Sequence, residues 1–222
     1  MAGAAVRVKI CCIKDPEEAR LAVEAGAAAL GLVSDMPSGP GIIDEETIAR
    51  VAAAAPPAVA TFLLTCRTGA AGIVEQVRRT GVSTVQVCDR PEPGTAAALR
   101  RALPALKVVQ VVHVTGPASV GEAEAAAEEA DAILLDSGNP EARVKELGGT
   151  GRRHDWGLSA RIVAAVRRPV FLAGGLTPDN VGEAIRAVRP WGLDLCSGVR
   201  TEGRLDAGKL ARFFEAVRAA TA

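Results

Sequence analysis

Residues 170–200 read VFLAGGLTPDNVGEAIRAVRPWGLDLCSGVR, and this stretch contains the unit from which the chain is built. Apolar runs at residues 170–173 and 193–196 flank a segment, residues 178–187, in which apolar side chains recur at helical spacing. Short, continuously apolar runs are typical of parallel strands that are covered on both faces, and the 3.6-residue period indicates an amphipathic helix. The stretch therefore predicts a strand–helix–strand unit.

The same alternation extends outward over the whole chain. Strand-like runs occupy residues 6–12, 29–33, 59–64, 84–87, 107–114, 132–135, 170–173 and 193–196. Helical stretches follow these runs at residues 16–25, 44–54, 70–79, 95–102, 119–128, 157–166, 178–187 and 206–220. Asp15-Pro16 and Thr177-Pro178 each offer an N-cap and a proline at the first helical position. Gly26 and Gly81 fall where helices should stop.

Eight strands, each followed by a helix, fit a closed (β/α)8 barrel of the TIM type. Such barrels need roughly 200 residues or more, and the chain has 222. We therefore expect an α/β fold with eight parallel strands and one domain over residues 1–222. The alternative is an open doubly wound sheet, which usually has a glycine-rich turn after its first strand. Here that turn, residues 11–16, reads CCIKDP, which favours the barrel.

Composition argues against several classes of partner. The chain carries 26 basic and 26 acidic residues, so we expect no basic face for nucleic acid or an anionic membrane. Its apolar runs are far shorter than the ~20 residues of a membrane span, and residues 1–9 lack the apolar core of a secretory signal. We expect a cytoplasmic protein. The five cysteines show no C-x-x-C spacing, which argues against a disulfide framework or a zinc ribbon.

Two strand ends carry small-residue turns. In (β/α)8 barrels the active site lies at the C-terminal ends of the strands, and phosphate often binds after strands 7 and 8 through backbone N–H groups. Gly174-Gly175 and Ser197-Gly198 occupy these two positions. Because glycine permits a close approach of the backbone to an anion, we predict a phosphate site; the alternative is two plain tight turns.

Two other strand ends carry groups suited to acid–base chemistry. Cys11 ends the first run, where a thiolate could act as a base or nucleophile; the alternative is a small buried core residue. Asp136 follows the sixth run, where burial beneath a loop would raise its pKa and let it act as a general acid. The alternative is a helix cap or a solvated loop acid.

Taken together, these motifs resemble those of the phosphoribosylanthranilate isomerase family along nearly the whole chain. Residues 8–11 (VKIC) match the family's opening strand with its catalytic base, and residues 134–137 (LLDS) match the strand with its catalytic acid. The other resembling segments are residues 25–31 (AGAAALG), 148–151 (GGTG) with Asp155-Trp156, 172–176 (LAGGL) with Asn180-Val181, and 197–199 (SGV).

The resemblance implies an isomerase of tryptophan biosynthesis that carries out an Amadori rearrangement of N-(5-phosphoribosyl)anthranilate to a 1-deoxyribulose phosphate, without a metal or organic cofactor. Asp136 would protonate the furanose ring oxygen, and Cys11, as a thiolate, would remove the proton from C2′. The substrate phosphate would bind to Gly149, Gly174, Gly175, Ser197 and Gly198. A homodimer is compatible with the family.

The sequence departs from the family around the anthranilate half of the site. Residues 36–41 (MPSGPG) lack the arginine that usually holds the anthranilate carboxylate. Cys88 stands in place of a histidine, Cys12 in place of a glycine and Arg200 in place of a glutamate. Arg200 or Arg152 could supply the missing cation from another loop.

Lys9 shares the inward face with Cys11, and we expect it to pair with Asp194 on the adjoining strand. Lys9, Cys88 and Arg200 are thus further candidates for substrate contacts. Two alternatives stay open: a paralogue that acts on a different phosphosugar amine, and a non-catalytic barrel that binds a phosphosugar. The rim cysteines would also allow a metal site or a reversible disulfide.

Overall fold

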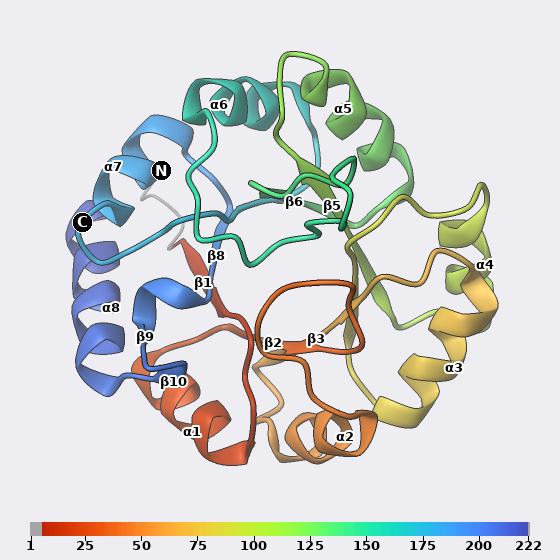
Figure 1. Ribbon diagram of the computed structural model, residues 1–222, viewed down its shortest axis with the longest axis horizontal. Helices are drawn as coiled ribbons and strands as arrows, with labels where there is room; N and C mark the ends of the chain where they lie inside the picture. Colours follow the sequence, from red (N-terminus) through yellow and green to blue (C-terminus); the bar gives the residue numbers. More distant parts are fainter. Residues whose placement is uncertain (1–5, 222) are drawn as a thin grey trace.

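The strands pair in chain order and close on themselves in the computed structural model, which describes residues 6–221 (Figure 1). β8 returns to pair in parallel with β1, so that Lys9 lies opposite Asp194 and Ile10 opposite Leu195. The barrel strands are β1 (Arg7–Ile10), β2 (Ala29–Val33), β3 (Ala60–Thr65), β4 (Thr84–Val87), β5 (Lys107–His113), β6 (Ala132–Asp136), β7 (Val170–Leu172) and β8 (Gly192–Leu195). The predicted (β/α)8 barrel is confirmed.

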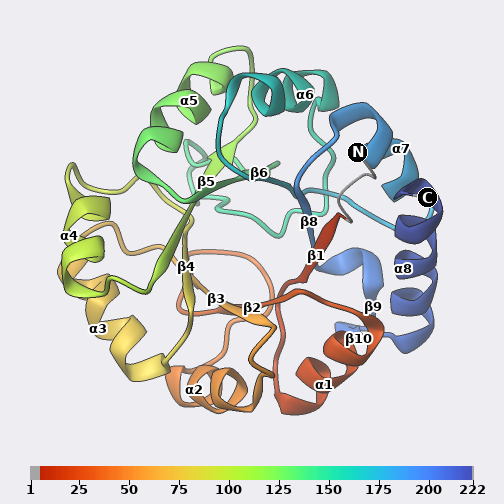
Figure 2. The same ribbon diagram turned by 180° about the vertical axis from the view of Figure 1, so that it is seen from behind.

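A ring of helices covers the outside of the barrel. Its members are α1 (Pro16–Ala25), α2 (Glu45–Ala54), α3 (Ala70–Thr80), α4 (Thr95–Ala102), α5 (Ser119–Glu129), α6 (Trp156–Ala165), α7 (Val181–Val188) and α8 (Ala207–Thr221). The long loop between β6 and α6 crosses the barrel mouth on the side turned to the viewer in Figure 1 and lies behind the strands in Figure 2. Within residues 6–221, no helix is long and apolar enough to cross a bilayer.

Two apolar layers hold the fold together. Ile133, Leu193 and Phe213 belong to the buried layer between strands and helices. Inside the barrel, Phe62 packs edge-on against Phe171 with 5.9 Å between ring centroids. Phe62 and Phe171 thus belong to the second apolar layer, which lies in the barrel interior.

Several local signals act as the sequence predicts. The Asp15 carboxylate caps α1 by accepting the backbone N–H of Glu18 at 2.8 Å. Gly26 and Gly81 end α1 and α3 in the left-handed region, with φ of 111° and 68°. These positions favour glycine because a Cβ disfavours a positive φ.

The predicted start of α7 is wrong. The helix begins at Val181 and not at residue 178, with Asn180 as its N-cap. Asn180 Oδ1 accepts the backbone N–H of Thr177 at 2.9 Å, and its amide donates to the Gly175 carbonyl at 2.8 Å. This side chain therefore holds residues 175–180 as a turn and ties the end of β7 to the helix.

Two further differences concern the neighbours of Cys11. β1 ends at Ile10, before the predicted residue 12, because Cys12 has a φ of 62° that no strand residue adopts. A short antiparallel hairpin, β9 (Arg200–Thr201) and β10 (Arg204–Leu205), precedes α8. The sequence patterns did not predict this hairpin.

Candidate active site

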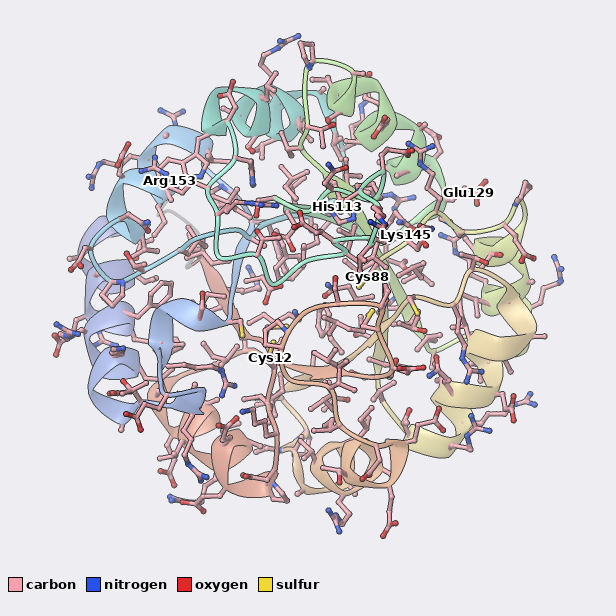
Figure 3. All side chains as sticks on the ribbon, viewed as in Figure 1. Cys12, Cys88, His113, Glu129, Lys145 and Arg153 are labelled. Carbon is pink, nitrogen blue, oxygen red and sulfur yellow. The ribbon has the colours of Figure 1, made fainter. Side chains whose placement is uncertain are left out.

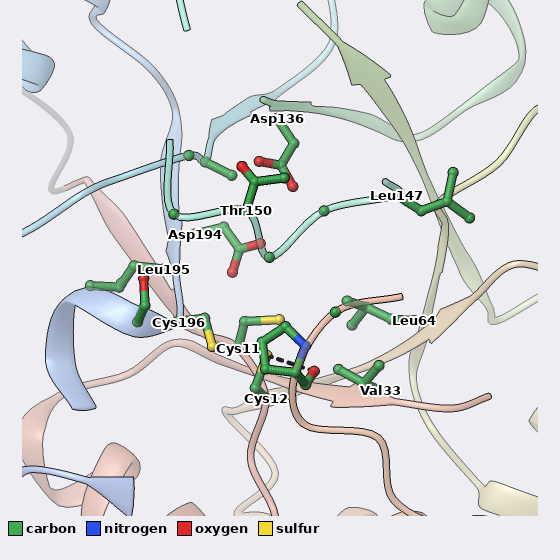
Figure 4. A pocket seen from close by; sticks show the side chains of 18 of the residues that line it. Cys11, Cys12, Val33, Leu64, Asp136, Leu147, Thr150, Asp194, Leu195 and Cys196 are labelled. Carbon is green, nitrogen blue, oxygen red and sulfur yellow. Dashed lines mark hydrogen bonds between the residues drawn. The ribbon is translucent and has the colours of Figure 1, made fainter. Parts of the chain in front are cut away.

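One cavity opens at the C-terminal ends of the strands, beneath the loops that follow β2 and β6 (Figure 4). Cys11 and Asp136 line it from the ends of β1 and β6, together with the glycine-rich turns after β7 and β8. The two loops meet above it, because Ser38 Oγ donates to the Lys145 carbonyl at 2.6 Å. Cys11, Asp136 and most of the predicted phosphate-binding residues thus line one cavity, whereas Lys9, Arg200 and Gly198 do not line it.

Cys11 extends the pairing of β1 with β8. Its backbone N–H donates to the Leu195 carbonyl at 2.8 Å, and its buried side chain faces the barrel interior. Gly31 on β2 leaves room for it: a Cβ at residue 31 would stand 2.9 Å from Cys11 Sγ and 3.0 Å from Lys9 Nζ. The thiol is therefore held in one position at the edge of the cavity.

Asp136 is the last residue of β6 and is half-buried. Its Oδ1 accepts the backbone N–H of Ser137 at 2.7 Å. Gly148, with a φ of 136°, covers Oδ2 so closely that a Cβ would stand 2.7 Å from that oxygen. Burial raises the pKa of Asp136, against the opposing effect of the Ser137 N–H. A carboxyl group that keeps its proton closer to neutral pH is suited to act as a general acid.

Lys9 and Asp194 form the ion pair that the sequence predicts. Lys9 Nζ lies 2.9 Å from Asp194 Oδ1, with the side chains 0% and 7% exposed. Burial by itself lowers the pKa of Lys9, but the Asp194 carboxylate and the nearby Cys11 and Cys12 thiols together outweigh it, so that the pKa stands above its ordinary value. Asp194 lines the cavity, whereas Lys9 lies behind it and supports Asp194. Lys9 thus reaches the site through its partner.

Gly174 and Gly175, after β7, and Ser197, after β8, line one part of the cavity. Gly174 and Gly175 adopt φ values of 85° and 64°, and Ser197 begins a single 3-10 turn, Ser197–Val199. The backbone hydrogen bonds found within residues 6–221 include none donated by Gly175, Ser197 or Gly198. Free N–H groups at small residues are what a bound phosphate requires.

Packing also demands glycine at these turns. A Cβ at Gly198 would stand 2.0 Å from the Leu176 carbonyl oxygen, and one at Gly175 would stand 3.0 Å from the Gly151 carbonyl. Gly149, with a φ of 68°, meets Pro40, where a Cβ would stand 2.6 Å from Cδ. The two turns and the loop after β6 therefore interlock around one corner of the cavity.

Two other candidate residues lie in different surroundings. Cys88 lines the cavity from the end of β4, and burial raises the pKa of its thiol. Arg200 does not line the cavity. Its guanidinium is buried, pairs with Glu18 at 2.8 Å and donates to the Cys12 carbonyl at 2.5 Å. Since these contacts occupy both terminal nitrogens, Arg200 holds residues 11–12 against α1 and does not replace the missing cation.

The sequence analysis did not single out two polar residues of the cavity. Gln86, on β4, is buried, and its Oε1 has no hydrogen-bond partner among the described residues. Thr150 Oγ1 lies 2.7 Å from Ser137 Oγ and so supports the residue that bonds Asp136. For Gln86, the sequence signal was a polar residue within an otherwise apolar strand. For Thr150, the only signal was its position in the GGTG loop.

The cavity is unusually poor in positive charge. Asp136 and Asp194 line it, and among residues 6–221 no Lys, Arg or His does. Two nearby cations, Lys145 and Arg153, are labelled in Figure 3. Both are engaged elsewhere: Lys145 pairs with Asp89 at 2.5 Å, and Arg153 lies over the Trp156 ring. Within the described chain, no group of three or more His, Cys, Asp or Glu side chains is arranged to hold a metal. The metal-binding alternative therefore has no supporting geometry.

A closed barrel with a thiol, a carboxylic acid and two glycine-rich turns around one cavity has the architecture of the (β/α)8 enzymes that act on phosphorylated small molecules. Residues 8–216 match the family model described as N-(5′-phosphoribosyl)anthranilate (PRA) isomerase. The chain belongs to this family of intramolecular oxidoreductases.

Individual relatives agree with this assignment. The chain is 37% identical to N-(5′-phosphoribosyl)anthranilate isomerase 2 of Methanosarcina mazei, over 94% of this chain and 92% of the relative. The solved phosphoribosyl anthranilate isomerase of Thermus thermophilus is 29% identical, with a TM-score of 0.81 over 96% of this chain and 99% of that one.

Two further solved structures carry information on ligand and assembly. One is a phosphoribosyl anthranilate isomerase in complex with reduced 1-(o-carboxyphenylamino)-1-deoxyribulose 5-phosphate, with a TM-score of 0.78 and 28% identity over 96% and 99% of the two chains. The other shows monomers generated from the dimeric isomerase of Thermotoga maritima, with a TM-score of 0.79 and 27% identity over the same shares.

Proposed function

We propose that the chain converts N-(5′-phosphoribosyl)anthranilate to its 1-deoxyribulose 5-phosphate isomer, with Asp136 as general acid and Cys11 as general base. The observation that carries this proposal is that both side chains line one cavity together with the turns after β7 and β8. The relatives named as isomerases of this substrate support the choice of reaction.

Asp136 begins the reaction by giving its proton to the furanose ring oxygen. The bond between that oxygen and C1′ breaks, and the nitrogen lone pair forms a Schiff base with C1′. The thiolate of Cys11 then takes the proton from C2′, which yields an enolamine that tautomerises to the ketone. One proton is given and one is taken, so exchange with solvent restores both groups. Burial favours the starting state of Asp136, because it raises the pKa of that carboxyl.

The phosphate of the substrate would bind at the corner formed by Gly149, Gly174, Gly175, Ser197 and Gly198. Ser197 is exposed and lines the cavity, as do Gly174 and Gly175, which adopt left-handed conformations. Holding the non-reacting phosphate at this corner would place the sugar ring between Cys11 and Asp136. A homodimer stays a prediction, supported by the dimeric relative from Thermotoga maritima.

The missing cation favours a second candidate, an isomerase for a different phosphosugar amine. A benzoate carboxylate would enter a cavity that, in the described part of the chain, is lined by two carboxyl groups and by no basic side chain. A bidentate arginine contact is roughly twice as strong as a neutral hydrogen bond. The second candidate therefore has an amine partner without a carboxylate.

Steady-state kinetics on the purified chain separates the two candidates. Phosphoribosylated anthranilate and phosphoribosylated aniline would be compared, with Cys11→Ser and Asp136→Asn as active-site variants and Cys66→Ser as the control thiol variant. The main proposal predicts a higher kcat/KM with anthranilate and a loss of about 10²- to 10⁴-fold in each active-site variant. A preference for aniline supports the second candidate, and full activity in both active-site variants would remove the proposed roles.

A further inference from the structure

Gln86 is a buried polar residue of the cavity whose acceptor oxygen is unused. It lies on β4 with 3% of its surface exposed, and it lines the cavity. Its neighbours Val85 and Val87 belong to the layer between strands and helices, so alternation along the strand turns Gln86 into the barrel. Gln86 Oε1 has no hydrogen-bond partner within residues 6–221. Since most buried polar atoms in folded proteins are hydrogen-bonded, an unused acceptor beside a cavity points to a ligand.

The surrounding side chains hold the amide and offer no donor to its oxygen. Gln86 Nε2 lies 3.8 Å from Cys88 Sγ, and that thiol contacts the Gln86 backbone carbonyl at 3.7 Å. The strand register places Leu64 on β3 and Val109 on β5 beside Gln86. Both neighbours are apolar and cannot donate a hydrogen bond from their side chains. The remaining source of a donor is the molecule that occupies the cavity.

Gln86 lies across the barrel from the corner that is expected to bind phosphate. The strands close in the order β1 to β8, so β4 and β8 face each other across the barrel (Figure 2). Ser197, in that corner, follows β8, whereas Leu64, Gln86 and Cys88 line the cavity from β3 and the end of β4. In a phosphoribosylated amine the phosphate and the amine are at opposite ends of the sugar. A substrate whose phosphate binds beside Ser197 would therefore extend its amine toward β4.

The carboxyl groups of the cavity already have a partner or a role. Asp136 is the proposed acid for the ring oxygen, and Asp194 is paired with Lys9 at 2.9 Å. A glutamine amide, unlike a carboxyl group, does not titrate, so its oxygen accepts a hydrogen bond at any pH. Gln86 thus offers a neutral acceptor to the amine end of the substrate.

We propose that Gln86 Oε1 accepts a hydrogen bond from the amine N–H of the substrate and is a further catalytic residue of the isomerase, an inference that rests on the proposed function. When the ring opens, the amine nitrogen shares its lone pair with C1′ and becomes positively charged, while its N–H bond stays intact. Hydrogen bonds from a charged donor are roughly twice as strong as those between neutral groups. Gln86 would therefore bind the transition state more tightly than the substrate. The substrates are thus phosphosugar amines that keep one hydrogen on the nitrogen.

Gln86→Met tests this role, because methionine keeps the length of the side chain and removes the acceptor. With phosphoribosylated anthranilate and aniline, kcat should fall by about 10²-fold, and KM should rise by only about 3- to 10-fold. Tm should rise, because the variant removes a buried polar group that has no partner in the free chain. A kcat within about threefold of the wild-type value on both substrates would overturn the proposal.

Gln76→Met is the matched control. Gln76 is also 3% exposed, but Thr65 Oγ1 donates to its Oε1 at 2.7 Å, and its Nε2 donates to Glu45 at 3.1 Å. It lies on α3 and does not line the cavity. The control variant should therefore lower Tm and leave kcat and KM unchanged. Tm changes of opposite sign in the two variants would support the difference between a partnered amide and one kept for substrate.

A substrate without the N–H gives a second test. Wild-type chain should prefer phosphoribosylated aniline over phosphoribosylated N-methylaniline by at least about 10²-fold in kcat/KM. Gln86→Met should lose most of this preference, to about tenfold or less, because the contact is then missing with both substrates. An equal preference in both chains would mean that the methyl group only clashes with the cavity, and would overturn the proposal.

Binding separates failure of this inference from failure of the proposed function. Full activity in both Cys11→Ser and Asp136→Asn would remove the proposed reaction, whereas full activity in Gln86→Met alone would remove only the role of Gln86. Reduced 1-(o-carboxyphenylamino)-1-deoxyribulose 5-phosphate, the ligand of a related solved structure, carries an amine N–H and needs no turnover. Titration calorimetry should show that Gln86→Met binds it about 3- to 10-fold more weakly than the wild-type chain. Equal dissociation constants would overturn the inference.

Discussion

The buried pair of Lys9 and Asp194 allows a quantitative test of how the barrel supports its active site. At 2.9 Å the two charges attract each other by about 6 kcal/mol at an effective dielectric constant of ~20. The loss of hydration of both groups offsets much of this attraction. Removing one partner leaves the other charge buried without compensation, and this typically costs about 3–5 kcal/mol. We therefore expect Lys9→Met or Asp194→Asn to destabilise the chain by that amount.

Thermal and urea unfolding measure this effect. For a chain of this length each kcal/mol shifts Tm by about 2–4 °C, so each single variant should melt roughly 6–20 °C lower. The double variant should be about as stable as either single one, so that the coupling free energy equals one single loss, about 3–5 kcal/mol. Because the pKa of Lys9 is raised, its contribution is fully present below the unfolded value of about 10.4. The deficit should thus be constant between about pH 6 and pH 9. Additive single effects, or losses below about 1 kcal/mol, would refute the reasoning.

Two other predictions concern titrating groups at the barrel mouth. Asp136→Asn should lower kcat by about 10²- to 10⁴-fold and yet raise Tm at neutral pH. The folded pKa of Asp136 is raised, so the wild-type chain loses stability as pH rises above the ordinary aspartate value; melts against pH should show the gap closing toward about pH 4. Burial lowers the pKa of His154 to about 4. The unfolded chain therefore binds a proton at this residue more readily than the folded chain, and the fold should lose stability as pH falls from about 6.5. In the variant His154→Asn, Tm should fall less steeply below about pH 6.5 than in the wild-type chain. An unchanged dependence of Tm on pH would contradict this role of His154.

The parts of the site that the sequence predicted are those carried by strand ends. Cys11 and Asp136 lie where a buried run stops, and the closure of a barrel brings every such position to one mouth. The pairing of Lys9 with Asp194 followed from the same reasoning, because alternation along a strand and the neighbouring register decide it. The alternation of side chains along a strand and the closed barrel topology were therefore sufficient to predict the positions of these residues.

The residues that were misread depend on contacts that periodicity does not encode. Arg200 pairs with Glu18 on α1, 182 positions earlier in the chain, by way of a hairpin that no pattern predicted. The start of α7 moved because the side chain of Asn180 bonds two backbone groups of the preceding turn. In both cases a polar side chain had several possible hydrogen-bond partners, and only the folded structure determines which of them it contacts.

The lack of a cation in the cavity has a consequence for the acid group as well as for substrate choice. Gly148, which covers Oδ2 of Asp136, lies against Gly39 of the loop at residues 36–41. An arginine in that loop would stand near the carboxyl group, and an adjacent positive charge lowers a carboxyl pKa by roughly 1–3 units. Without it, burial raises the pKa of Asp136 with less opposition, and in the proposed reaction the proton for ring opening would be retained at higher pH. In the proposed reaction, the departure at residues 36–41 would thus weaken recognition of an anionic amine and at the same time strengthen the proton donor.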